Sequence, residues 1–310
     1  MRKLTKGFLI FGVVATILGF IMIVVGAQSN GIQSLLAMSK DPIYDNRTEE
    51  VTFGNEVEKL DLALEEHSLT ITESVDDKIH ITYHPSVSGR HDLTTGMSDK
   101  TLTVTDKQAS QHRFLGSGIE SLLRIASNYS NRFDEVVLSL PKGRKLQAIT
   151  VSANRGQTNI RQANFENATI KTKGYHLRIT ESSIKNSTLT TPSIINIFDT
   201  ELTDSQVKTE GGHIYAENIK IQGKVELDSH NDLRLFLSKT EFDRINLDMS
   251  SKHGGIYRKA QREHPKQKEN ELANPYKTEK ADVKDLLIIK ANQDIYLPKE
   301  EEYSAPPSNH

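Results

Sequence analysis

The sequence predicts an all-β protein, a β-solenoid or β-helix-like stack of coils of about 19 residues, preceded by one N-terminal transmembrane helix. Two observations predict it. Short apolar strands and turns containing Gly or Asn recur with a nearly fixed period between residues 146 and 260. In addition, 21 residues near the N-terminus carry no charge, which is the length that a helix needs to cross a bilayer.

Composition narrows the possible classes of protein. The 310 residues have a formal net charge of −2, so nothing in the overall charge favours nucleic acid as a partner. Cysteine is absent, which excludes disulfides, zinc–thiolate sites and cysteine nucleophiles. Hydrophobic residues make up 36% of the chain, which favours an elongated fold with a thin core.

Residues 1–6 are expected to be cytoplasmic and residues 7–27 to form the transmembrane helix. Three basic residues precede the apolar run and the next charge is Lys40, so the positive-inside rule places the rest of the chain outside the cell. A signal peptide cleaved after Ala27 is the alternative, but the run is longer than a typical signal core. Both interpretations predict export, and the anchor predicts a single-pass protein of a Gram-positive-like cell membrane.

A tether is expected at 28–50, and apolar–polar alternation begins after it. This pattern predicts β-strands with one buried face. The segments that show it are 57–64, 68–74, 78–84 and 101–106.

One amphipathic helix is expected to interrupt the strands, at 117–127. Its apolar residues recur at helical spacing, and Ser117 with Glu120 forms a capping box. A lid over an open end of the β-structure and a docking helix are both compatible with it. A strand and a Pro-Lys-Gly turn, 134–146, then lead into the repeats.

The repeats share an internal order of apolar strand, turn, second strand and, in most of them, a third apolar corner. Their predicted boundaries are Leu146–Phe165, Glu166–Ile184, Lys185–Leu202, Thr203–Ile221, Gln222–Thr240 and Glu241–Ala260. Because no coil can bury its apolar face alone, the next coil is expected about 4.8 Å above it. We expect Gly and Asn in the turns because a sharp corner requires positive φ.

The C-terminal part completes the predicted β-strand-repeat domain, 51–298. Residues 258–282 are highly charged and predict a loop. Residues 283–298 repeat the strand–turn–strand pattern and are interpreted as the last coil, and 299–310 as a disordered tail.

These repeats resemble the bacterial β-strand-repeat "putative adhesin" domain family of unknown function. The segment "LIIKANQDIYL" (287–297) matches its strand–turn–strand pattern best, followed by "VELDSHNDLRLFL" (225–237) and "IKTKGYHLRIT" (170–180). His176 and His213 stand where the pattern has aspartate. Membrane-anchored relatives are similar to components of Lia-type cell-envelope stress systems, which implies an extracellular binding or sensing role without catalysis. The family supplies no catalytic residues.

Three sets of residues are candidates for a site, and each is better explained as surface decoration. His176, His213 and His253 occupy equivalent turns, but the coils that carry them are two apart, too far for a shared metal ion. Six aspartates could act like the carboxylates of polysaccharide-cleaving β-helices, namely Asp199, Asp204, Asp228, Asp232, Asp243 and Asp248. A basic run could meet anionic lipid or wall polymer, namely Arg258, Lys259, Arg262, Lys266 and Lys268.

The sequence therefore predicts no catalytic, metal or cofactor-binding residues and no cofactor. The favoured function is a membrane-anchored, extracytoplasmic binding, adhesin-like or stress-sensing module. Its expected partner is an envelope protein or a cell-wall polymer. The alternatives are a carbohydrate-active β-helix enzyme and a self-associating structural scaffold.

Overall fold

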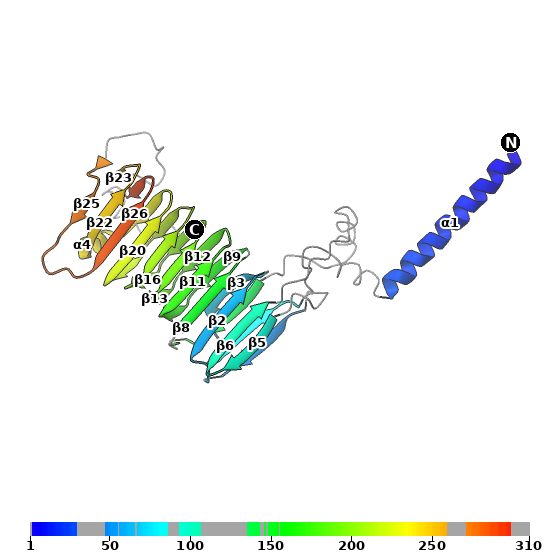
Figure 1. The fold of residues 1–310 in the computed structure, drawn as a ribbon, viewed down its shortest axis with the longest axis horizontal. Coiled ribbons are helices and arrows are strands. Elements are labelled where there is room, and N and C mark those ends of the chain that lie inside the picture. The colour runs from blue at the N-terminus through cyan, green and yellow to red at the C-terminus, as the bar shows by residue number, and fades with distance from the viewer. Residues whose placement is uncertain are drawn as a thin grey trace. The chain divides into compact units, whose positions relative to one another are not determined.

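The computed structural model describes residues 2–29, 47–54, 56–65, 67–85, 93–106, 135–142, 146, 148–154, 156–258 and 271–298. They belong to two compact units. The first contains helix α1 (Arg2–Gln28), and the second contains the β-structure (Figure 1). The predicted helix at 117–127 and the tail at 299–310 lie outside the described residues, as does most of the predicted tether.

Helix α1 covers the apolar run of the N-terminus. Apolar side chains that the structure describes on it are exposed, among them Phe11, Ile17, Phe20 and Met22. Among the described residues, no helix combines the length and the apolarity that a membrane crossing requires, so the transmembrane assignment of 7–27 is not supported.

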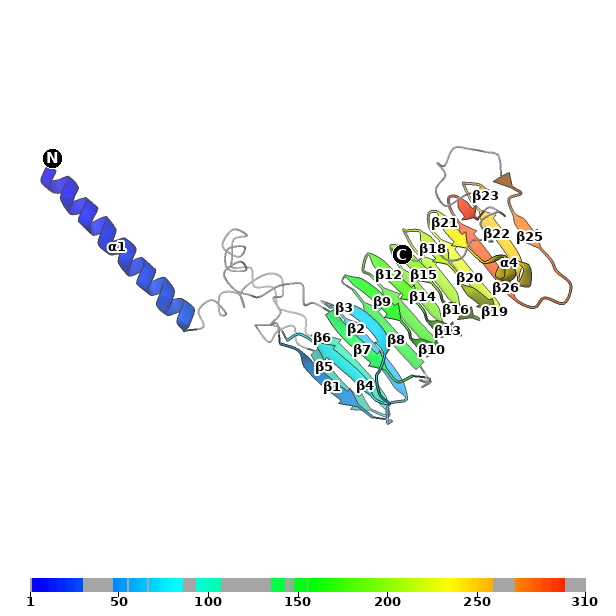
Figure 2. The ribbon, with the colours of Figure 1, turned by 180° about the vertical axis from the view of Figure 1, so that it is seen from behind.

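The β-unit is a solenoid, as predicted. A 12-stranded and an 11-stranded sheet form its two long sides, and a 4-stranded sheet forms a third side along the central part. Each rung contributes one strand to each long sheet, and Figure 2 shows the central rungs stacked in sequence order.

The central rungs confirm the predicted coils between 146 and 240. Their strands are β8 (Ala148–Ala153), β9 (Gln157–Arg161), β10 (Asn164–Glu166), β11 (Ala168–Thr172), β12 (His176–Thr180), β13 (Ser183–Lys185), β14 (Thr188–Thr191), β15 (Ile194–Phe198), β16 (Glu201–Thr203), β17 (Gln206–Thr209), β18 (Ile214–Glu217), β19 (Lys220–Gln222), β20 (Lys224–Ser229) and β21 (Leu233–Phe236).

Parallel pairing places like residues above one another in the core. Ile170 pairs with Leu189, Leu189 with Val207 and Val207 with Leu227. All four side chains are fully buried. Burying a side chain of this size contributes about 1.5–3 kcal/mol, so we expect these columns to dominate the stability of the stack.

The N-terminal end does not follow sequence order. The rung of β2 (Lys59–Leu64) and β3 (Ser68–Glu73) stacks on β8 and β9, and the later rung of β6 (Thr101–Asp106) and β7 (Glu135–Leu140) stacks outside it. Antiparallel strands close this end, namely β1 (Glu49–Phe53), β4 (Ile79–Tyr83) and β5 (Leu93–Ser98).

The C-terminal end corrects two predictions. The segment 283–298 is not the last coil, because its strands β26 (Leu286–Ala291) and β27 (Ile295–Leu297) insert between β20–β21 and the rung of β22 (Asn246–Ser251) and β23 (Ile256–Arg258). The predicted loop 258–282 contains two antiparallel strands, β24 (Glu271–Leu272) and β25 (Tyr276–Thr278), which pair with the last rung.

Helix α4 (Lys239–Arg244), which the sequence analysis missed, closes the open edge of the 4-stranded sheet. The buried Glu241 carboxylate accepts the backbone N–H of Ile221 in β19, at 2.6 Å. Arg244 donates to the carbonyl of Ile221 and to Glu241. Two side chains thus replace the backbone groups that a further strand of this sheet would supply, and Ser238 caps the helix.

The prediction that turn glycines require positive φ is confirmed at Gly156 and is wrong at Gly212. Among the described glycines, only Gly156 and Gly223 have positive φ. Gly212 is instead required by close approach, because a Cβ there would lie 2.0 Å from the carbonyl oxygen of Ser193 in the neighbouring rung. Positive φ occurs at the corners beside the 4-stranded sheet, for example at Asp199 (47°), a residue type that tolerates it.

Candidate functional site

Side chains on the outer face of the 12-stranded sheet form rows along the stack. Alternation within strands and pairing in register bring this about. One row joins Asn196, Tyr215, Arg234 and Tyr296 on β15, β18, β21 and β27. Tyr257 of β23 pairs with Tyr296 and extends the row.

A neighbouring row carries two further rings. Phe198 and Phe236 each pair with Glu217 of β18, one from either side. We call the five rings of these two rows the aromatic face: Phe198, Tyr215, Phe236, Tyr296 and Tyr257.

The rings of the aromatic face contact one another. The centroids of Phe198 and Tyr215 are 5.5 Å apart, and those of Tyr215 and Phe236 are also 5.5 Å apart, both pairs tilted. Tyr296 and Tyr257 are stacked at 5.9 Å. All these separations lie in the favourable range for aromatic pairs, so half-buried rings hold each other in place.

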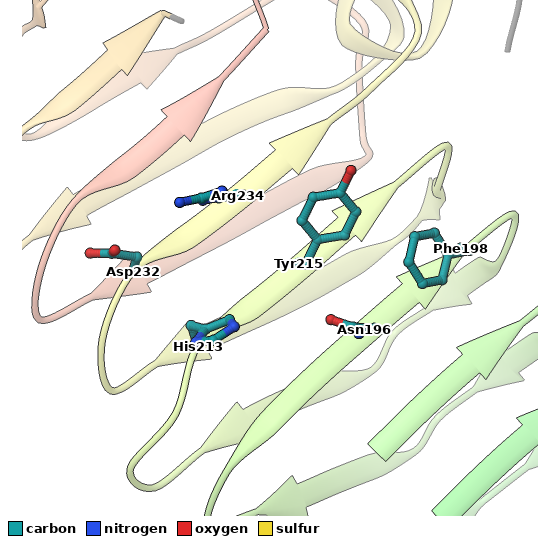
Figure 3. Close-up of a pocket in the computed structure, with 6 residues that line it drawn as sticks. All are labelled: Asn196, Phe198, His213, Tyr215, Asp232 and Arg234. Carbon is teal, nitrogen blue, oxygen red and sulfur yellow. The ribbon is translucent and has the colours of Figure 1, made fainter. Parts of the chain in front are cut away.

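A hollow of about 440 Å³ opens on this face. Figure 3 shows its lining on β15, β18 and β21 and on the residues just before two of these strands: Asn196, Phe198, His213, Tyr215, Asp232 and Arg234. Its size lies within the range of small-ligand sites, about 300–1,000 Å³. The lining mixes ring faces with hydrogen-bond donors and acceptors.

The phenol groups are held as hydrogen-bond donors. The Tyr215 hydroxyl donates to Glu217 at 2.7 Å, and that of Tyr296 donates to Asp294 at 2.9 Å. Burial and the bond to Asp294 raise the pKa of Tyr296 far above its usual range, and burial also raises the pKa of Tyr257. The phenols of Tyr296 and Tyr257 therefore remain neutral at physiological pH.

Two exposed arginines cover rings of the aromatic face. The guanidinium of Arg178 lies 5.2 Å from the Phe198 centroid, and that of Arg234 lies 5.6 Å from the Tyr296 centroid. Both distances are those of cation–π contacts. The charged heads stay accessible to solvent while their contact with the rings fixes their positions.

The three candidate histidines are not brought together. His176 begins β12 and accepts from the Asn196 amide, at 2.8 Å between the nitrogens. His213 lines the hollow two strands away, beyond β15, and His253 lies in the turn before β23. Burial, with Arg178 and His213 nearby, lowers the pKa of His176. The described residues contain no group of three or more His, Asp or Glu that could hold a metal ion.

The six candidate aspartates lie on different faces. Asp199 and Asp204 flank β16, and Asp228 and Asp248 lie on the outside of the 11-stranded sheet. Asp243 is in α4, and Asp232 lines the hollow. Asp228 and Asp248 form ion pairs with lysines. The structure does not gather the six into one cleft.

The candidate basic run lies mostly outside the described residues. Only Arg258 is described; it ends β23, and its guanidinium lies 5.2 Å from the Phe242 centroid. The Arg258 side chain therefore packs on the ring of Phe242 in α4.

Sequence reasoning missed the aromatic face, although a signal existed. The strand sequences "IINIF" (194–198), "LRLF" (233–236) and "IYL" (295–297) carry rings in the phase that alternation assigns to solvent. Apolar rings at outward positions of neighbouring coils indicate either a supporting ladder or a recognition surface.

Comparisons with known proteins give a match to one family model and similarity to solved structures. The model of the family described as Toastrack DUF4097 matches residues 57–297. One similar solved structure is a "putative cell adhesion protein" from Clostridium sporogenes ATCC 15579, 12% identical, covering 84% of this chain and 100% of that chain, with a TM-score of 0.29. Another is a "putative adhesin" from Bacteroides fragilis NCTC 9343, 10% identical, covering 82% and 98%, with a TM-score of 0.33. Scores this low say nothing about function. No curated protein matches the chain.

Proposed function

The chain belongs to the Toastrack DUF4097 family, and on that premise we propose that it is a non-catalytic, adhesin-like binding protein of the cell envelope. The aromatic face carries this proposal. It presents rings, cations and amide groups together on the outside of one sheet, a combination typical of non-covalent recognition sites.

The scaffold favours binding because it is rigid beneath the site. Strand β18 is paired in parallel on both sides, with β15 and with β21, and its inward residues Ile214 and Ala216 are fully buried. Side chains on such a strand lose little freedom when a ligand arrives. Pre-organisation of this kind reduces the entropic cost of binding.

The carboxylates near the hollow favour binding over hydrolysis. An Asp232 oxygen accepts the backbone N–H of Asp294, at 3.2 Å. The Asp294 carboxylate accepts the N–H of Gly255 at 2.9 Å and the hydroxyl of Tyr296. Groups engaged by the backbone are poorly placed to exchange protons with a substrate, as general acid–base cleavage of a glycan requires.

We propose the cell membrane as the location of the protein, with the β-solenoid outside. Support comes from the uncharged run at 7–27 and from exposed apolar side chains such as Ile17 and Phe20 on α1. In this location, binding of an envelope component to the aromatic face would allow the protein to act as a sensor of the cell envelope.

Fractionation of cells that express the full chain tests the location. We expect the chain in the membrane pellet after alkaline extraction, and degradation of the β-solenoid by protease added to intact cells. Ile17→Lys should release the chain from the pellet, whereas Thr16→Ser, at an adjacent position, should not. A wild-type chain protected from protease in intact cells would contradict this location.

End-to-end self-association is disfavoured by the caps. The outermost strands at the C-terminal end, β24 and β25, have 2 and 3 residues and run antiparallel to the rungs. Short edge strands of this kind hinder further strand addition. Sedimentation of the full chain in detergent should therefore show no polymer that grows through this end as the concentration rises.

Co-sedimentation with purified Gram-positive cell walls tests the binding function. We expect the full chain to bind, and Tyr215→Ala to reduce the bound fraction strongly. Tyr175→Ala is the matched control, because Tyr175 is an exposed tyrosine in the turn before β12. Equal binding of wild type and Tyr215→Ala to the cell walls would show that the aromatic face is not the binding surface.

A further inference from the structure

We infer that the aromatic face binds a neutral polysaccharide chain of pyranose sugars that runs along the stack, across the rungs. This inference rests on the proposed function, because it names the ligand class of the same face. The shape of the face, its hydrogen-bonding groups and its charge each point to this ligand class.

The shape of the face fits a row of sugar rings. A pyranose ring has an apolar C–H face, which packs on an aromatic ring, and hydroxyl groups at its edge. Phe198, Tyr215 and Phe236 form one platform, whose neighbouring rings are tilted by 44° and 41° to one another, and Tyr296 with Tyr257 forms a second. Arg178 lies over Phe198 and Arg234 over Tyr296, so the rings that these two guanidinium groups leave for sugar stacking are Tyr215, Phe236 and Tyr257. From β15 to β23 the two platforms cross four strand spacings, about 19 Å at about 4.8 Å each. A ligand that uses both platforms must be extended along the stack.

The polar groups fit sugar hydroxyls, each of which both donates and accepts. The Asn196 amide donates and accepts hydrogen bonds, the Asp232 carboxylate accepts them, and the planar guanidinium of Arg234 donates them. These groups line the same hollow as the rings of Phe198 and Tyr215 (Figure 3). Sugar rings stacked on the platform would therefore have their edge hydroxyls beside matching partners.

The charges favour a neutral chain over a polyanion. Within the hollow, the charge of Arg234 is balanced by that of Asp232. Around the rings, Glu217 and Asp294 receive the hydroxyls of Tyr215 and Tyr296. Arg178 over Phe198 adds a second cation, so a phosphate- or carboxylate-rich polymer would meet three carboxylates and two guanidinium groups, and the excess of negative charge costs binding energy.

Intrinsic tyrosine fluorescence provides the assay, because the chain has no tryptophan. The full chain in detergent is titrated with cellohexaose and with chitohexaose as neutral probes. The anionic control is hexagalacturonic acid. We expect a saturable change with at least one neutral hexamer, weaker binding of the corresponding dimer, and no saturation with the anionic hexamer.

Variants assign the binding to the face. Tyr215→Ala should weaken hexamer binding by about tenfold or more, because it removes the middle ring of the platform. Tyr215→Phe keeps the ring and should bind nearly as wild type, while Arg234→Ala should weaken binding by a smaller factor. Tyr175→Ala should change nothing. Circular dichroism of each variant checks that the fold is retained.

The outcomes separate this inference from the proposed function. Binding of the anionic hexamer alone, or equal hexamer binding by wild type and a folded Tyr215→Ala, overturns the neutral-glycan assignment. If cell walls bind the wild-type chain more than Tyr215→Ala but no neutral hexamer binds, the ligand class is wrong and the binding function stands. If neither cell walls nor hexamers bind, both are wrong.

Discussion

Replacement of Glu241 by Ala should destabilise the C-terminal half of the solenoid measurably. Its carboxylate, 8% exposed as a residue, accepts the N–H of Ile221 at 2.6 Å and pairs with Arg244 at 2.7 Å. Truncation leaves a buried N–H without an acceptor, which costs about 1–3 kcal/mol, and removes a charge-assisted bond of about 1.5–3 kcal/mol. Because these two contributions overlap, we expect a loss of about 2–4 kcal/mol in the free energy of unfolding.

Two further variants sharpen this prediction. Glu241→Gln keeps an acceptor for the Ile221 N–H and should lose clearly less stability. Asp243→Ala removes an exposed acid from the same helix and should stay within about 0.5 kcal/mol of wild type.

Urea unfolding of the full chain gives the free energy, and amide hydrogen exchange gives the location. We expect faster exchange at Ile221 and along β19 in Glu241→Ala, while β11 exchanges as in wild type. Equal stability of the Ala and Gln variants, with unchanged exchange at Ile221, would refute the account of α4 as an edge cap.

Three other predictions concern the stack. Gly212→Ala should lower the unfolding midpoint in urea markedly, because the new Cβ would lie 2.0 Å from the Ser193 carbonyl oxygen; a wild-type midpoint would show that the turn is not so tightly packed. Leu202→Ala should cost about 2–5 kcal/mol by calorimetry or urea unfolding, because this side chain is fully buried, and a loss below about 1 kcal/mol would argue against a close-packed core there. Hydrogen bonds to Asp76 and then Glu50 raise the pKa of His80, so its contribution to stability is fully present below its unfolded pKa and is lost as pH rises through the folded pKa. The difference in melting temperature between wild type and His80→Ala should therefore shrink from about pH 6 to about pH 9, and a constant difference would contradict this assignment.

The coils of the central rungs could be predicted from the sequence because local periodicity determines them. Residues such as Leu177 and Ile195 alternate with polar neighbours and recur at the spacing of one coil. In the structure these two pair in register and are fully buried.

The order of the rungs at the two ends could not be predicted in this way. Leu287 of β26 lies between Val225 of β20 and Leu247 of β22, and all three are buried apolar residues in strands of similar pattern. Alternation shows that each strand has a buried face, but it does not show which strand is its neighbour. Pairing between distant segments depends on the packing of the whole end of the solenoid.

Two missed features did leave local signals. Ser238, the N-cap of α4, and Glu241 in its first turn have the spacing of a capping box. Rings such as Tyr215 and Tyr296 occupy outward positions of their strands. The assembly of these rings into one surface depends on register, so it became visible only in the structure.

Saturation-transfer NMR on the full chain with a bound neutral hexamer tests the central claim most directly. Irradiation of the sugar C–H protons should transfer saturation to the ring protons of Tyr215 and Phe236 and leave those of Tyr175 unaffected. Transfer to residues on the outer face of the 11-stranded sheet, with none at Tyr215, would contradict the assignment of the aromatic face as the binding surface.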